Sequence, residues 1–212
     1  MKILLLGPPA SGKGTIGSLL SSELNIPLIN TGHLLRQVPK ESIWYYPIRE
    51  AMDKGLLAPD NMVAGLLKEV TSDSLYENGY LLDGWSRQLN DLKYFDPGFD
   101  IVVHLTIDKD TSWKRIKNRR ICSLNGHSYD LLLKPPQKKD ICDIDNSFLV
   151  KRKDDTKEIF NTRWRSHLVQ TVPVIDYFKK LGNLIEVNAN GNINEVFDEV
   201  INEITLRRKA LV

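Results

Sequence analysis

The 212-residue sequence lacks any hydrophobic run near the roughly 20 residues that a membrane-spanning helix needs. It contains only two cysteines, Cys122 and Cys142, too few for the disulfide framework of a small secreted domain. Neither sign of charge is in excess, because 29 basic residues face 27 acidic ones, and the net charge of +2 gives no reason to expect a nucleic-acid partner. We therefore expect a soluble, cytoplasmic protein that binds neither membranes nor nucleic acid and acts as a monomer.

The chain does contain a regular alternation of short apolar runs and helical stretches. Apolar runs without polar alternation are typical of strands buried on both faces of a parallel sheet, and they occur at 2–6, 27–30, 80–83, 100–107 and 183–187. Helices are expected at 13–24, 61–75, 110–120, 155–181 and 194–206. This order predicts an α/β fold with a doubly wound parallel sheet.

Two stretches depart from that alternation. Residues 31–58 read as mostly helical, although they separate two strands that are expected to be neighbours. Residues 121–153 are rich in turn signals, such as Asn125-Gly126 and Pro135-Pro136. We expect both to rise as insertions from a core made of residues 1–29, 59–120 and 154–212, the insertions being residues 30–58 and 121–153.

A glycine-rich loop, GPPASGKGT at residues 7–15, follows the first predicted strand and opens the first predicted helix. Glycines let backbone N–H groups turn towards an anion, and the helix N-terminus adds its positive dipole end. Lys13 can reach outer phosphates, and Thr15 supplies the hydroxyl that usually follows the lysine directly. The alternative is an ordinary glycine-rich turn, but the strand–loop–helix context favours binding of a nucleoside triphosphate.

Further motifs lie along the chain at NTGHLLR (30–36), LLDGWSRQ (81–88), RIKNRRIC (115–122) and KRKDD (151–155), followed by Arg163. With the glycine-rich loop, they follow the order and spacing of the adenylate kinase family, which the chain resembles nearly end to end. The resemblance implies a P-loop core with a five-stranded parallel sheet, a nucleoside-monophosphate-binding insertion at 30–58 and a long lid at 121–153. It also implies reversible phosphoryl transfer from ATP-Mg to AMP, giving two ADP.

The resemblance assigns roles residue by residue. The groups expected around the transferring phosphoryl are Lys13, Arg87, Arg119, Arg152 and Arg163. The expected ATP contacts are Pro9, Ala10, Ser11, Gly12, Lys13, Gly14, Thr15, Arg115 and Arg119, with Arg115 on the adenine and the 189–192 loop beside it. The expected AMP contacts are Thr31, Arg36, Leu56, Ala58, Gly84, Arg87, Asp91, Arg152 and Arg163. Asp83 is expected to hold magnesium-bound water.

Elementary chemistry supports an arginine-rich site. Phosphoryl transfer spreads negative charge over equatorial oxygens, so catalysis consists mainly of positioning and electrostatic stabilisation. Arg115 and Arg119 are four residues apart, which predicts that both side chains lie on the same face of one helix. Arg152 and Arg163 would lie about three turns apart if one helix contained both. An isolated arginine is more often a solvated surface residue, but this set stands at its motif positions. Asp154 and Asp155 are expected near these arginines, or as helix N-caps.

Two departures from the family pattern bear on the substrates. His33 stands where the family usually has an aspartate, which predicts weaker magnesium assistance and pH-dependent activity. Asp91 stands where a glutamine usually reads the adenine, and a carboxylate only accepts hydrogen bonds. Three alternatives remain open: the protein is a kinase for GMP, Gln88 or Asn90 recognises the base in place of Asp91, or the chain is a weakly active nucleotide-binding module. AMP remains the favoured substrate.

The lid carries a third departure. Some family members bind zinc there through two ligand pairs, which fall here at Cys122 with Asn125 and at Cys142 with Asp145. An amide is a poor zinc ligand, although His127 could replace Asn125 if the turn bends. We therefore favour a polar network over zinc at Cys122, Cys142 and Asp145.

Overall fold

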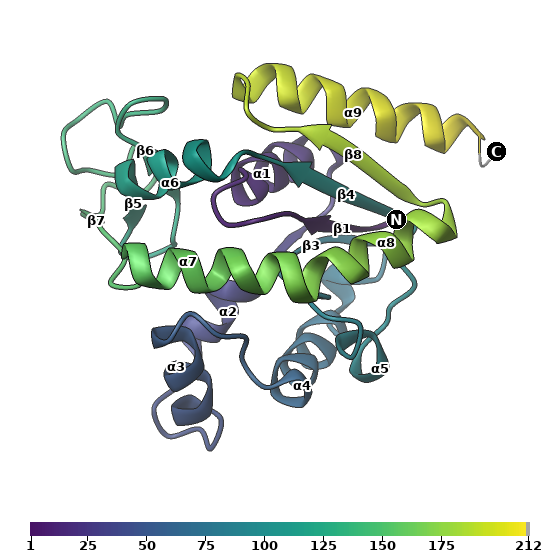
Figure 1. The fold of residues 1–212 in the computed structure, drawn as a ribbon, viewed down its shortest axis with the longest axis horizontal. Coiled ribbons are helices and arrows are strands. Elements are labelled where there is room, and N and C mark those ends of the chain that lie inside the picture. The colour runs from purple at the N-terminus through teal and green to yellow at the C-terminus, as the bar shows by residue number, and fades with distance from the viewer. Residues whose placement is uncertain (211–212) are drawn as a thin grey trace.

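The computed structural model describes residues 1–210 and contains a five-stranded parallel sheet. The strands are β1 (Lys2–Leu6), β2 (Leu28–Asn30), β3 (Tyr80–Asp83), β4 (Ile101–Thr106) and β8 (Leu184–Asn188). Their order across the sheet is β2-β3-β1-β4-β8 (Figure 1). The predicted α/β fold and its five strands are confirmed, with ends that differ by one residue. The order brings the carboxyl ends of β2, β3 and β1 side by side, where the polar motifs begin.

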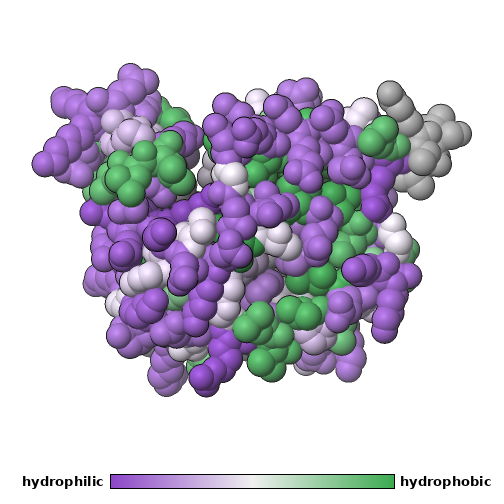
Figure 2. Space-filling model, turned by 45° about the horizontal axis from the view of Figure 1, so that its top comes forward, coloured by the Kyte–Doolittle hydropathy of each residue, from purple (hydrophilic) through white to green (hydrophobic). Residues whose placement is uncertain are grey.

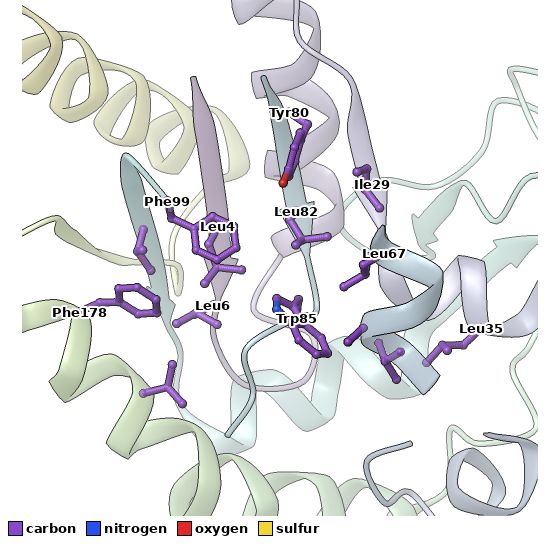
Figure 3. Packing of buried hydrophobic residues seen from close by; sticks show 14 of the residues in the cluster. Leu4, Leu6, Ile29, Leu35, Leu67, Tyr80, Leu82, Trp85, Phe99 and Phe178 are labelled. Atoms are coloured by element: carbon purple, nitrogen blue, oxygen red, sulfur yellow. The ribbon is translucent and has the colours of Figure 1, made fainter. Parts of the chain in front are cut away.

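Both faces of the sheet are buried, as the unbroken apolar runs predict. Leu4 and Leu6 of β1 point into a cluster that includes Leu82, Trp85 and Phe178 (Figure 3). The alternate residues of β1, Ile3 and Leu5, face a second cluster on the other side. Burial of a leucine or isoleucine side chain contributes about 1.5–3 kcal/mol, so this strand anchors the core and the phosphate loop that follows it.

Helices cover the two faces. In chain order they are α1 (Lys13–Leu24), α2 (Thr31–Gln37), α3 (Tyr45–Asp53), α4 (Asp60–Thr71), α5 (Asp91–Tyr94), α6 (Lys109–Asn118), α7 (Lys157–Ser166), α8 (Val172–Leu181) and α9 (Ile193–Ala210), with a short 3₁₀ turn η1 (Ser74–Tyr76). Helices α1 and α9 lie on one face, and α8 and the 31–71 helices lie on the other (Figure 1). Within residues 1–210, no helix is both long enough and apolar enough to cross a membrane. The surface in Figure 2 is mostly hydrophilic, with hydrophobic side chains in smaller areas.

Four helix predictions are wrong in their bounds, and the helix expected at 194–206 extends to Ala210. The helix expected at 61–75 ends at Thr71. The helix expected at 110–120 ends at Asn118, because Arg119 takes an extended conformation and begins a strand. The helix expected at 155–181 begins only at Lys157, after Thr156 caps it by accepting from the Ile159 N–H.

That same helix is also interrupted by a π-helical segment, η2 (His167–Thr171). Val172 N–H donates to the His167 carbonyl, five residues back. Pro173 follows at once and has no N–H with which to keep α-helical bonding, so the wider turn is a natural adjustment.

Residues 119–150 contain a small antiparallel sheet that the turn-rich sequence did not predict. Its strands are β5 (Arg119–Cys122), β6 (Ser128–Asp130) and β7 (Leu149–Val150), in the order β6-β5-β7. Cys122, Tyr129, Cys142 and Leu149 form its own hydrophobic cluster. The segment lies beyond one end of the main sheet (Figure 1).

Candidate active site

The glycine-rich loop connects β1 to α1 and is shaped by its glycines. Gly7 has φ 147°, and a Cβ atom there would lie 2.5 Å from the Leu105 carbonyl oxygen. Gly12, with φ 95°, is the N-cap of α1. The Lys13 ammonium donates to the carbonyl oxygens of Gly7 and Pro8, both at 2.8 Å. The loop is therefore curled around its own lysine, with the α1 N-terminus behind it.

Asp83 ends β3, which pairs with β1, and Lys13 begins α1 after the loop that follows β1. Burial lowers the pKa of Lys13 to about 8, with a further contribution from Arg87 and Arg119 and an opposing one from Asp83. Burial likewise raises the pKa of Asp83, against the attraction of Lys13. The Asp83 Oδ2 atom accepts from the side-chain amide of Asn30 at 2.9 Å, which fixes the carboxylate at this edge.

Two aspartates gather the predicted arginines. Asp154 Oδ2 accepts from Arg36 at 3.1 Å and also from Arg163. The buried Asp155 carboxylate accepts from both Nε and Nη2 of Arg119 in a bidentate pair. These contacts join α2, β5 and α7 around one region, and a carboxylate pair of this kind holds a guanidinium in a fixed plane.

Within residues 1–210, no carboxylate forms an ion pair with Arg152. Its Nε atom is buried without a hydrogen-bond partner. Burial, together with the positive charges of Arg119 and Arg36, lowers its pKa to about 9. With Lys13, Arg36, Arg87, Arg119 and Arg163, it forms the cationic cluster, which three carboxylates (Asp83, Asp154 and Asp155) leave incompletely neutralised. The cluster therefore suits a polyanion.

The arginines converge, but not by the predicted route. Arg115 lies on α6, whereas Arg119 belongs to β5, so the two do not share a helix face. Arg152 precedes α7 and is not on one helix with Arg163. Because Thr156 caps α7, Asp154 and Asp155 are ion-pair partners rather than helix caps.

A second group of predicted residues meets at the other end of the loop. Arg115 Nη2 donates to the Ala189 carbonyl at 2.8 Å and approaches that of Gly191 at 3.4 Å. Its Nη1 lies 3.5 Å from the Ala10 carbonyl. The residues expected around the ATP adenine are thus brought together from α6, the glycine-rich loop and the 189–192 loop.

The predicted monophosphate residues divide into two groups. Thr31 is buried, and its hydroxyl has no hydrogen-bond partner among the described residues. Gly84 has φ 91° and leaves room for Arg87, because a Cβ atom at residue 84 would lie 2.9 Å from Arg87 Nη2. Leu56 and Ala58 line a separate cavity of about 810 Å³ between α3 and α7. Gln88, one of the alternatives to Asp91 for recognising the base, lines the same cavity.

The expectation for Asp91 is not supported by its surroundings. Its side chain is only 5% exposed, and its Oδ2 accepts from the backbone N–H groups of Arg87 (2.7 Å) and Gln88 (3.1 Å). Asp91 does not line the cavity. The carboxylate therefore closes the turn after β3, and the sequence could not distinguish this local role from base recognition.

His33 lies on α2 and faces the 119–150 segment, where a Cβ at Gly126 would lie 3.0 Å from His33 Nδ1. Desolvation and the charges of Arg36 and Arg152 lower its pKa. The imidazole is therefore neutral near neutral pH and cannot supply the negative charge of the aspartate that it replaces.

The two cysteines belong to a group of four metal-ligand types. Ligand atoms of Cys122, His127, Cys142 and Asp145 all lie within 4.8 Å of one another. Asn125 is not among them, since its amide donates to Asp145 Oδ2 at 2.9 Å. Cys122 Sγ also donates to Asp145 Oδ2 at 2.9 Å. The same donors, two thiols with an imidazole and a carboxylate, suit Zn²⁺.

Comparisons with known proteins agree with this geometry. The family model described as "Adenylate kinase" matches residues 5–183. The chain is 38% identical over 205 residues to "Adenylate kinase" of Clostridium kluyveri, covering 93% of this chain and 94% of the relative. It is 35% identical over 211 residues to that of Bacillus velezensis (94% and 96%) and 35% over 212 residues to that of Thermosipho africanus (96% and 99%). The family model matches most of the chain and each of these relatives covers more than nine-tenths of it, so the chain belongs to the adenylate kinase family of phosphotransferases, which act on ATP and AMP.

Proposed function

We propose that the chain transfers a phosphoryl group reversibly from ATP-Mg to AMP by holding the two nucleotides tail to tail across the cationic cluster. The observation that carries the proposal is the convergence of six cationic side chains, from the glycine-rich loop, α2, the 84–90 turn, β5, the 151–155 segment and α7. ATP and AMP together bring several negative charges, which this excess of positive charge would balance.

ATP would bind on the glycine-rich loop with Arg115 against its adenine. Lys13 would exchange its present bonds to the Gly7 and Pro8 carbonyls for phosphate oxygens. A bound phosphate stabilises the ammonium form, so the lysine would stay charged at neutral pH although its pKa is depressed in the free protein.

The AMP phosphate would bind to Arg36 and Arg87, and Arg119, Arg152 and Arg163 would contact the phosphoryl group in flight. Asp154 and Asp155 orient three of these arginines before any nucleotide arrives. Groups aimed in advance at developing charge need no reorganisation during the reaction, which is the main source of catalysis available here.

Magnesium would enter with ATP. Asp83 fits it, because the carboxylate lies beside Lys13 at the end of β3 and a hard oxygen donor suits this ion. Bound magnesium would neutralise charge on the phosphates, and Asp83 would accept a hydrogen bond from one of its waters. His33 adds no charge to this arrangement, so we propose that Asp83 is the main carboxylate for magnesium.

AMP is the monophosphate that we propose, and the comparisons give no support to GMP. The Thr31 hydroxyl is buried without a partner and is free to bond to the base. We also propose that residues 1–29, 59–120 and 154–212 are the fixed core, while residues 30–58 and 121–153 close over the monophosphate and ATP respectively.

We propose that the lid binds one Zn²⁺ through Cys122, His127, Cys142 and Asp145, whose ligand atoms already converge. Metal analysis after purification without added metal should find one zinc per chain, and a chelator should lower the unfolding temperature. A Cys142→Ser variant should lose the metal, whereas Ser123→Ala, at an exposed lid serine, should keep it. If the wild-type protein contains no zinc and binds none when zinc is added, the four side chains form a polar network instead of a metal site.

We propose that the protein works as a cytoplasmic monomer. All the residues of the cationic cluster come from one chain, so no second copy is needed to complete it. The two cysteines form no disulfide, which suits a reducing compartment. Sedimentation with and without nucleotide should give the mass of one chain.

The test of the catalytic proposal is a panel of nucleoside monophosphates, each assayed with ATP for ADP formation, with and without magnesium. AMP should give the highest kcat/KM, and omission of magnesium should reduce the rate strongly. Folded protein that forms no ADP from ATP and any monophosphate would overturn the proposal.

A further inference from the structure

Gln88 is placed to recognise the base of the monophosphate, a role that Asp91 cannot fill. The Asp91 carboxylate already accepts hydrogen bonds from the backbone N–H groups of residues 87 and 88. Gln88 is half-buried and its side chain lines the 810 Å³ cavity. The same cavity is lined by Leu56 and Ala58, two of the expected AMP contacts, and by Leu57 between them.

The orientation of the Gln88 amide is fixed by Asp60. Gln88 Nε2 donates to Asp60 Oδ1 at 2.5 Å, and Asn90 Nδ2 donates to Asp60 Oδ2 at 2.8 Å. A carboxylate has no proton to donate when ionised, so the amide nitrogen of Gln88, and not its oxygen, must face Asp60. This contact uses one of the two amide protons of Gln88 and leaves the acceptor Oε1, beside the second N–H, for a ligand.

An acceptor at this position favours a base with an amino group on its edge. The 6-amino group of adenine can donate to Oε1, whereas the 6-oxo group of guanine or hypoxanthine is itself an acceptor and would face Oε1 without a proton between them. We propose that Gln88, oriented by Asp60, reads the 6-position of the monophosphate base and selects adenine. This proposal rests on the proposed function, because it assigns specificity within the same reaction.

Three substrates separate this role from others: AMP, purine riboside monophosphate, which has no 6-substituent, and IMP, which has a 6-oxo group. Each is assayed with saturating ATP-Mg for kcat/KM. Loss of a hydrogen bond to an uncharged group costs about tenfold to a hundredfold in kcat/KM. The wild type should therefore prefer AMP over purine riboside monophosphate by about that factor.

Gln88→Leu should abolish the preference, so that kcat/KM for AMP and kcat/KM for purine riboside monophosphate become similar. Asp60→Asn should release the Gln88 amide, which could then rotate and donate to a 6-oxo group. The ratio of kcat/KM for IMP to kcat/KM for AMP should therefore rise, although Gln88 is still present. The matched control is Gln170→Leu, which makes the same replacement at another residue that lines the cavity and that already bonds to Ser166. It should leave the AMP preference intact.

The outcomes are separable. Wild-type protein that phosphorylates no monophosphate would overturn the proposed function. Wild-type protein active with AMP, with a Gln88→Leu variant that keeps the full preference for AMP over purine riboside monophosphate, would overturn only the role of Gln88. A loss of that preference in Gln170→Leu instead would move the role to Gln170 and overturn the proposal equally. Thermal unfolding of each variant checks that it is folded.

Discussion

The role of an individual residue was predictable from the sequence where the site needs a particular backbone conformation or a particular charge at that position. Gly7 and Gly12 hold conformations that a side chain would oppose, and Lys13 follows them at the required position. Asp91 was not predictable, since an aspartate that bonds to two backbone N–H groups has the same place in the motif as one that reads a base. Gln88 was within a recognised motif, but only the contact with Asp60 singles it out.

Removal of one cation from the cluster should reduce catalysis without unfolding the protein. Arg87→Ala should lower kcat/KM for AMP by about 10²–10³-fold, the usual cost of one preorganised group that stabilises the transition state. The unfolding midpoint should change little, because Arg87 is exposed to the cleft and makes no side-chain hydrogen bond among the described residues. Arg208→Ala, an exposed arginine on α9, is the control and should keep full activity. An unchanged kcat/KM in Arg87→Ala would show that Arg87 does not contact the monophosphate.

The depressed pKa of Lys13, about 8, predicts a pH dependence of nucleotide binding. Phosphate binding requires the ammonium form, so the Kd for ATP should rise as pH passes about 8 and approach about a tenfold increase per pH unit above it. Titration calorimetry from pH 6.5 to 9.5 measures this directly. In a Lys13→Arg variant the step near pH 8 should disappear, because arginine stays protonated. The same step in both proteins would assign it to another group.

At the scale of elements, the sheet and its first helix were accurate predictions, because buried parallel strands and the phosphate loop have strong local signals. The end of α6 was not, since Arg119 reads as the next residue of a basic helix. Its bidentate pair with Asp155 and its pairing with β6 are contacts distant in sequence, and they override local helix propensity. The lid strands are only two to four residues long and leave almost no periodic pattern.

The turn between β3 and α5 should respond to pH through Asp91. Burial raises the pKa of Asp91 to about 6, above its ordinary value of 3.8, with a smaller contribution from Asp60. The folded protein therefore binds the proton more tightly, and the stability from this residue is fully present below about pH 4 and is lost as pH rises through about 6. The free energy of unfolding of the wild type relative to Asp91→Asn should fall across that window, because asparagine keeps an acceptor but does not titrate. A flat difference from pH 4 to 7 would contradict this assignment.

Asp154 is the element-scale link between α2 and α7, since it pairs with Arg36 and Arg163. Asp154→Asn should raise the KM for AMP more than it lowers kcat, because Arg36 would lose its fixed orientation while keeping its charge. The expected change in KM is about fivefold to thirtyfold, corresponding to about 1–2 kcal/mol for a partly buried charged hydrogen bond. Steady-state kinetics with AMP as the varied substrate tests it, and a pure kcat effect would place the role of Asp154 in the transfer step.

At the scale of the whole molecule, one parallel sheet presents the ends of β1, β2 and β3 to arginines from three other regions of the chain. The sequence could indicate each part but not their convergence, which depends on Asp154 and Asp155 and on the fold of residues 119–155. That convergence is what allows two nucleotides to share one set of cations.

The most direct test of this central claim is titration calorimetry with a dinucleotide in which two adenosines are joined through five phosphates. The account predicts one molecule bound per chain, with a Kd far below that of ATP or AMP alone, and displacement of both nucleotides at once. Two independent sites, or competition with only one of the two nucleotides, would contradict it.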